Sequence, residues 1–318
     1  MIPLTYTLSI EQESTLRHIE MLRAQLLSFV VPLYIERARR WALRIDTVSA
    51  AYTLIQEPTT VAHIEQAIQA RKPSHHQFSY KRYWKTLEQI TEDWTGSNLY
   101  RNSQSYIELF QSLELLKQSK NTTGTPVQEA IVTGVGYISS GNEHPVIQAA
   151  IMSALLFTCD MDTRDAYFCA LLSAEGIFVT HGYTCHDRVS PLTQWAKEAV
   201  SLKKAIESIN RTQNLNHWIL FVTLSIKKSL EDAIQSLQDT QLTDIASSTI
   251  DRYMRLSRRQ KDILQLLQKP GSTVNNSFLQ RQFGISQMTA SRELSHLTSL
   301  GLLSPYGKSR SISYTRIG

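Results

Sequence analysis

Apolar residues recur every three or four positions through much of the chain, which is the spacing of one buried helix face. The first such stripe is Leu16, Ile19, Leu22, Leu26 and Val30, and Ser9 with Gln12 has the sequence of a capping box ahead of it. Further helices are expected at about 33–55, 60–72, 105–116 and 194–209, and a long one from Asn214. The pattern predicts a mainly α-helical protein.

Two segments, 144–157 and 166–175, are apolar on almost every side and are expected to form the buried centre. Pro145 fits the first turn of the first helix, and Gly176 is expected to end the second. Only the short acidic turn 158–165, with its single arginine Arg164, separates them.

Two other segments allow alternatives. Residues 129–138 are rich in valine, isoleucine, threonine and glycine, so we consider a short β hairpin or flap there. The aromatic segment 75–94 could stack on nucleic-acid bases. Tyr80, Tyr83, Trp84, Leu87 and Ile90 lie at helical spacing, however, which favours a core face.

The last sixty residues predict three short helices followed by two strands. Ser257 and Ser286 are candidate N-caps, Ala290, Leu294 and Leu297 form an apolar side, and strands are expected at 302–304 and 311–315. This order is typical of a winged helix-turn-helix domain. The opposite face of the third helix and the tip between the strands then carry the candidate DNA-binding residues Gln287, Met288, Thr289, Ser291, Arg292, Ser295, Lys308 and Arg310.

Charge is concentrated in the same region. Residues 251–318 contain 11 Lys/Arg and 3 Asp/Glu, a net charge of +8. The remainder has 33 − 11 = 22 basic and 28 − 3 = 25 acidic residues, a net charge of −3. A basic excess confined to one module is the electrostatic signature of nucleic-acid binding, although winged helices also dock on proteins.

Composition limits the protein class. The 318 residues are 42% hydrophobic and 19% charged, which is ordinary for a globular protein. The three cysteines do not suggest a disulfide framework, the N-terminus lacks the pattern of a signal peptide, and no apolar run reaches the ~18 residues of a membrane span. We expect a cytoplasmic protein with no membrane partner. His181, Cys185 and His186 are close in sequence, but a fourth zinc ligand is not evident.

The order of segments 144–157, 170–177, 214–226 and the C-terminal module resembles Fic-domain proteins, in particular the long forms that end in a winged helix. The resemblance covers roughly residues 140–318. It implies a helical core and the transfer of AMP or a related group from a nucleotide with magnesium to protein hydroxyls. It also implies a loop of the form HPFx(D/N)GNGRxxR between the two apolar helices.

This sequence departs from that loop. Residues 158–165 contain no histidine, glycine or asparagine, and only Asp162 and Arg164 could stand for the acidic and phosphate-binding positions. A general base and an anion-binding nest are therefore not evident. Upstream, residues 42–49 resemble the family's inhibitory segment, with Asp46 at the position of its glutamate; an ordinary helix with a surface aspartate explains them equally well.

Together these observations predict an N-terminal helical region (1–120), a degenerate Fic-like helical core (121–250) and a winged helix-turn-helix domain (251–318). The function that they favour is a homodimeric regulator of transcription or of another DNA-directed process, which binds double-stranded DNA and needs no metal or cofactor. A protein or small ligand would bind the Fic-like body. The alternatives are an active Fic-type nucleotidyltransferase using ATP and Mg²⁺, with the winged helix recruiting substrates, and a non-catalytic adaptor.

Overall fold

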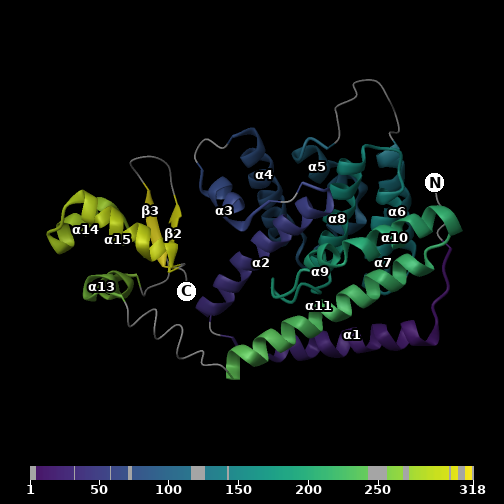
Figure 1. Ribbon diagram of the computed structural model, residues 1–318, viewed down its shortest axis with the longest axis horizontal. Coiled ribbons are helices and arrows are strands. Elements are labelled where there is room, and N and C mark those ends of the chain that lie inside the picture. Colours follow the sequence, from purple (N-terminus) through teal and green to yellow (C-terminus); the bar gives the residue numbers. More distant parts are fainter. Residues whose placement is uncertain are drawn as a thin grey trace. The chain divides into compact units, whose positions relative to one another are not determined.

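The computed structural model describes residues 5–31, 33–57, 59–70, 74–115, 126–141, 143–242, 256–267, 272–300, 302–306 and 312–316 (Figure 1). The protein is mainly α-helical, as the sequence predicts, and has one small sheet in this part of the chain. It divides into two compact units. The first comprises Met1–Phe29 and Trp41–Gln235, and the second comprises Val30–Arg40 and Ser236–Gly318.

The first unit is built from helices whose ends follow local sequence signals. Ser9 and Gln12 form the predicted capping box, and Thr60 and Ser74 accept hydrogen bonds at the starts of two later helices. The helices are α1 (Ile10–Ser28), α2 (Leu33–Leu54), α3 (Val61–Gln69), α4 (His75–Gln89), α5 (Ser103–Ser112), α6 (Pro126–Ser140), α7 (Pro145–Phe157), α8 (Thr163–Thr180), α9 (Pro191–Lys197), α10 (Ala199–Thr212) and α11 (Asn216–Leu242), with short π and 3₁₀ turns at Ile90–Trp94 and Leu99–Arg101. Only the ends of α2 and α11 extend beyond this unit.

Helices α7 and α8 are the centre of the first unit, as their apolar sequences predict. Buried residues make up 11 of the 13 in α7 and 13 of the 18 in α8, and the Trp218 indole of α11 donates to the Ala150 carbonyl at 2.6 Å. The aromatic face of α4 also lies in the core, with Tyr83 and Trp84 buried. The aromatic segment therefore packs inside the protein and does not present those rings to nucleic acid.

Gly176 does not end α8, contrary to the sequence prediction. The helix continues to Thr180, and a Cβ atom added at Gly176 would lie 2.4 Å from the Trp94 ring. Glycine is required there because the ring packs directly on the helix backbone. Close packing, and not a left-handed C-cap, is the reason for this glycine.

The proposed β flap at 129–138 is also wrong, because these residues belong to α6. Its buried positions are Val127, Ala130, Ile131, Gly134, Val135 and Ile138, which have helical spacing. Gly134 lies against Met152 of α7, where a Cβ atom would be 2.7 Å from the sulfur. The helical period of the apolar residues therefore outweighs the β propensity of valine, isoleucine and threonine.

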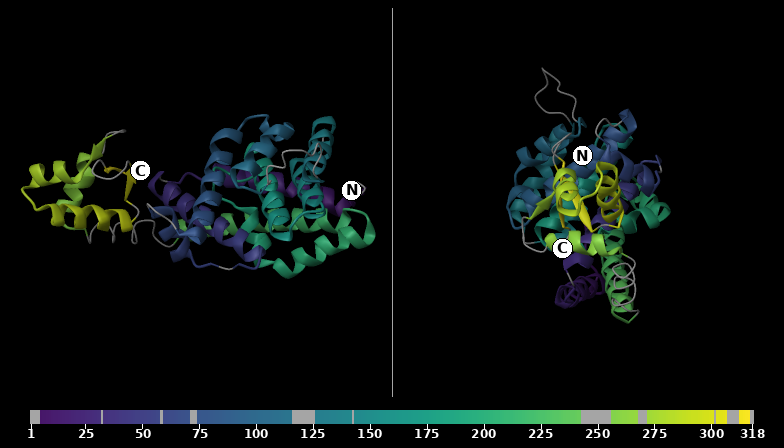
Figure 2. Two further views of the ribbon diagram at one scale, coloured as in Figure 1. Left: turned by 90° about the horizontal axis from the view of Figure 1, so that it is seen from above. Right: turned by 90° about the vertical axis from the view of Figure 1, so that its left-hand side faces the viewer.

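The second unit ends in a helical and sheet-forming segment, seen from two further directions in Figure 2. Its elements are α13 (Arg258–Leu266), β1 (Thr273–Val274), α14 (Asn276–Phe283), α15 (Gln287–Ser299), β2 (Leu303–Tyr306) and β3 (Ser313–Arg316). The strands form an antiparallel sheet in the order β1-β3-β2. The short strand β1 was not predicted, because its two residues give no visible alternation.

The core of this segment matches the predicted apolar side of α15. Ala290, Leu294 and Leu297 are fully buried, and they pack with Ile263 of α13 and Leu279 of α14. Ser257 and Ser286 both accept the expected capping hydrogen bonds. The predicted DNA contacts Lys308 and Arg310 lie outside the described residues. No described helix is both long enough and apolar enough to cross a membrane.

Candidate functional site

The turn between α7 and α8 holds Asp162 and Arg164, the two residues that could replace a catalytic loop. The Asp162 carboxylate caps α8 by accepting from the Arg164 backbone N–H at 3.0 Å. The Arg164 guanidinium forms a two-point ion pair with Glu57, with Nε–Oε1 at 3.1 Å and Nη2–Oε2 at 3.4 Å. It also lies over the Phe168 ring. Both side chains thus have structural partners within the protein.

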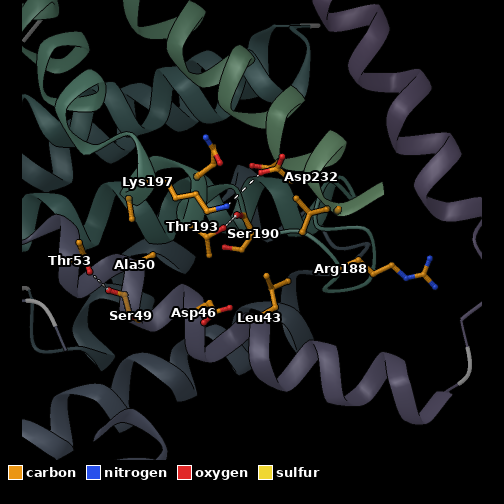
Figure 3. Close-up of a pocket in the computed structure, with 15 residues that line it drawn as sticks. Leu43, Asp46, Ser49, Ala50, Thr53, Arg188, Ser190, Thr193, Lys197 and Asp232 are labelled. Atoms are coloured by element: carbon orange, nitrogen blue, oxygen red, sulfur yellow. Dashed lines mark hydrogen bonds and ion pairs between the residues drawn. The ribbon is translucent and has the colours of Figure 1, made fainter. Parts of the chain in front are cut away.

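Asp46 lies elsewhere, in an open pocket of about 490 Å³ within the first unit (Figure 3). In that view Leu43, Asp46 and Ser49 of α2 lie across from Ser190 and Thr193, with Lys197 and Asp232 beside them. Loss of hydration raises the pKa of the Asp46 carboxyl, and the nearby Lys197 charge acts in the opposite direction. Asp46 makes no hydrogen bond or ion pair with any residue that the structure describes.

A buried carboxyl lines a second, smaller pocket that shares Leu43, Val189 and Ser190 with the first. Glu175 of α8 is 7% exposed, and its pKa is raised to about 8 by burial first and by the neighbouring Asp187 charge second, while the Arg44 charge acts in the opposite direction. Arg44 pairs with Asp187 at 3.0 Å and with Glu88 at 3.6 Å. Glu175 Oε2 has no hydrogen-bond partner among the described residues. The raised pKa favours the protonated form of this carboxyl at neutral pH.

The backbone next to Asp187 is strained. Cys185, His186 and Asp187 have φ angles of 49°, 61° and 60°, so three consecutive non-glycine residues adopt the left-handed conformation. Such residues are uncommon outside glycine and persist only where the surroundings impose them. Here Arg188 donates from Nη1 to the carbonyls of Leu26 (2.9 Å) and Phe29 (3.1 Å) at the end of α1.

A polar cluster joins α1 to the start of α7. The His144 ring accepts from the Val146 backbone N–H through Nδ1, so Nε2 carries the proton and faces Glu20 Oε1 at 3.2 Å. The Tyr183 hydroxyl also donates to Glu20. Burial lowers the His144 pKa despite Glu20. The cluster caps and anchors helices, and every one of its members has a partner.

The zinc hypothesis does not gain support from the described residues. They contain no group of three or more His, Cys, Asp or Glu side chains that could hold a metal ion. His181 packs edge-on against the Tyr100 ring, and Cys185 is buried.

The outer face of α15 in the second unit brings six of the predicted DNA-contacting residues together on one helix. Met288 is 67% exposed, Gln287, Arg292 and Ser295 are exposed, and Thr289 and Ser291 are half-buried. Arg292 makes no ion pair with another described residue. Its guanidinium is thus available to a ligand.

A side-chain cluster fixes α15 on α13. Glu293 is only 15% exposed and accepts from Gln260 Nε2 at 2.6 Å and from Arg259 Nη1 at 3.3 Å. Gln260 also contacts His296 Nδ1 at 3.1 Å. Glu293 therefore fixes α15 against α13 and faces α13 instead of the exposed side of α15.

Sequence reasoning missed Glu175 and the polar wall of the Asp46 pocket. Glu175 carries a usable signal, because it is a carboxyl inside an otherwise apolar helix. Ser190 and Gln194 carry none, because the other walls of the pocket come from residues 43–53 and 229–233, which are distant in sequence.

Comparisons with known proteins address the fold. The structure is similar, over 99% of this chain and 98% of the other, to a crystal structure of a Fic family protein from Desulfovibrio desulfuricans G20, with a TM-score of 0.57 and 11% sequence identity. The fold is Fic-like. No protein-family model matches the sequence, and no curated protein matches it. The similarity supports the architecture that the resemblance implied, and the chemistry has to be argued from this chain's own residues.

Proposed function

We propose that the protein is a DNA-binding regulator, in which the C-terminal segment is a winged helix carried by a Fic-like body. The observation that supports it most is the exposed polar face of α15, opposite the buried side formed by Ala290, Leu294 and Leu297. This face lies in the region with a net charge of +8. A helix with this arrangement fits the major groove, where base edges are read.

In this proposal each exposed residue of α15 makes the DNA contact that its side-chain chemistry allows. Arg292 donates two hydrogen bonds to a guanine, and Gln287 pairs with an adenine. Met288 and Thr289 supply apolar contact with thymine methyl groups, and Ser291 and Ser295 accept or donate as the base requires. Lys308 and Arg310 contact phosphates from the tip between the strands.

Two copies of the chain would bind paired half-sites. A single small module offers few base contacts, and joining two on one duplex raises affinity through the effective concentration of the second. The homodimer is thus part of the proposal.

The deciding experiment selects binding sites from a random duplex pool with the full-length protein and then measures affinity across salt concentrations. We expect one enriched sequence and a log–log salt slope of about −0.9 for each phosphate neutralised. Failure to enrich any sequence, or an affinity independent of salt, would refute DNA binding.

Arg292→Ala is the matching variant, and Arg17→Ala is its control. Arg17 is an exposed arginine of the first unit that pairs only loosely with Glu13, at 4.0 Å. Loss of Arg292 should reduce discrimination at one guanine by about 1–3 kcal/mol, whereas loss of Arg17 should leave discrimination unchanged. Equal effects of the two substitutions would mean that only net charge matters.

The nucleotidyltransferase alternative makes a specific structural demand. Arg164 would have to leave Glu57 to contact a phosphate, and Asp162 would have to leave the α8 N-terminus to hold a magnesium ion. The residues present therefore do not fit the ATP–magnesium group that the resemblance implies, and we propose no transfer step. Incubation with labelled ATP, magnesium and a cell lysate tests this, since labelled protein that disappears with Arg164→Ala would establish the alternative.

A further inference from the structure

Several polar groups that line the pocket between α2, α9 and α11 remain free only as hydrogen-bond acceptors. Three of its hydroxyl groups use their single hydrogen on a main-chain carbonyl: Thr53 on Ser49 at 2.9 Å, Thr193 on Ser190 at 2.7 Å, and Ser229 on Ser225 at 2.8 Å. A hydroxyl that has already donated its hydrogen can only accept a hydrogen bond from a ligand. These walls therefore favour a ligand that donates.

The side-chain amide of Gln194 also leaves an acceptor for a ligand. Its Nε2 donates to Glu198 Oε1 at 2.6 Å, which fixes the amide so that Oε1 is the remaining group. That oxygen and the Ser190 hydroxyl are buried, and neither has a partner in the described part of the chain. A buried oxygen without a hydrogen bond is costly, so a donor that reaches it is bound favourably.

The two basic side chains that line the pocket, Lys197 and Arg188, already have partners within the protein. Lys197 Nζ lies 3.6 Å from Asp232 Oδ2, and Arg188 donates to the carbonyls of Leu26 and Phe29 at the end of α1. Figure 3 shows the Arg188 side chain extending away from the other labelled residues of the pocket. Asp46, in contrast, faces the pocket without an ion-pair partner among the residues described. Asp46 is therefore the carboxylate of this pocket that can pair with a cationic ligand.

We propose that this pocket binds a small organic cation, namely a primary ammonium compound that also carries hydroxyl or amide hydrogens. The ammonium group lies at Asp46, and the additional donors face Thr193, Ser229 and Gln194. The volume of about 490 Å³ is in the range that holds such molecules. An anionic ligand such as a nucleotide triphosphate meets acceptors and a carboxylate here, so the pocket disfavours it.

The test uses the full-length chain and pairs of compounds that differ in one ammonium group: glucosamine with glucose, and 2-aminoethanol with ethylene glycol, together with magnesium ATP. Calorimetric titration should show binding of the ammonium member of each pair at least about ten-fold tighter than its neutral partner, the ratio that one ion pair supplies. Equal binding within both pairs, absence of binding by every ammonium compound, or tighter binding of ATP would overturn the proposal.

Two variants locate the binding. Asp46→Asn keeps the side-chain shape and should remove the preference for the ammonium member, and Thr193→Val replaces an acceptor oxygen with a methyl group and should weaken both pairs. Asp160→Asn, at an exposed aspartate outside the pocket, is the control and should have no effect. A preference that survives in Asp46→Asn would place the ligand elsewhere. The assay contains no DNA, so its outcome is independent of the function proposed above.

Discussion

Replacing Glu175 with glutamine should remove a pH dependence from the stability of the first unit. Glu175 is buried in α8, and burial raises its pKa from 4.5 to about 8. Glutamine has the same shape and no charge. The variant therefore keeps the packing and loses only the titration.

The sign follows from the two pKa values. A carboxyl whose pKa is higher in the folded protein contributes stability that is fully present below the unfolded value of 4.5 and is lost as pH rises through about 8. Each pH unit in that window is worth about 1.4 kcal/mol, so the total is on the order of 5 kcal/mol. Glu175→Gln should consequently be more stable than the native protein at pH 8, by an amount that shrinks toward pH 5.

Urea unfolding followed by tryptophan fluorescence measures this directly. All five tryptophans lie between residues 41 and 218, so their signal reports on the first unit alone. Glu92→Gln, at an exposed glutamate, is the control. If the unfolding free energies of Glu175→Gln and the native protein change in parallel from pH 5 to pH 8, Glu175 is not held in its neutral form and the reasoning is wrong.

Three further substitutions test separate features. Gly176→Ala should destabilise the first unit by about 1–3 kcal/mol in the same assay, because its Cβ would lie 2.4 Å from the Trp94 ring; Gly136→Ala, where no atom lies within 4 Å, should be neutral or stabilising. Glu293→Gln should lower the melting temperature of the second unit, since it weakens the charged contacts that are worth about 1.5–3 kcal/mol each between α13 and α15; circular dichroism measures it, and an unchanged melt would show that the cluster is incidental. Arg164→Ala should cost less than about 1 kcal/mol, because its ion pair is nearly half exposed, and a larger loss in urea titration would indicate an undetected role.

The helices of this protein could be predicted because their apolar spacing and their caps are local. The α7 and α8 segments, the α15 core side and the caps at Ser9, Ser257 and Ser286 were confirmed for that reason. The prediction that Gly176 ends α8 was wrong because a glycine that makes room for an aromatic ring and a glycine that ends a helix look identical in sequence.

The two candidate sites also differ in how far local sequence predicts them. The face of α15 follows from helical periodicity alone, so its residues could be proposed before the structure was known. The pocket could not, because Asp46 meets Lys197 and Asp232 across some 150–190 positions of sequence and only the tertiary fold brings them together. The same holds for Glu57 and Arg164, which are 107 positions apart.

The left-handed turn at 185–187 has a consequence for the order of folding. Three residues in this conformation are locally unfavourable, so the turn does not hold itself together. Its supports come from the Arg44–Asp187 ion pair and from the hydrogen bonds of Arg188 to α1, which span 143 and 159–162 positions of sequence. The turn should therefore form only after α1 and α2 have docked on the core, and in the native state its amides should be among the first to exchange with solvent when α1 detaches.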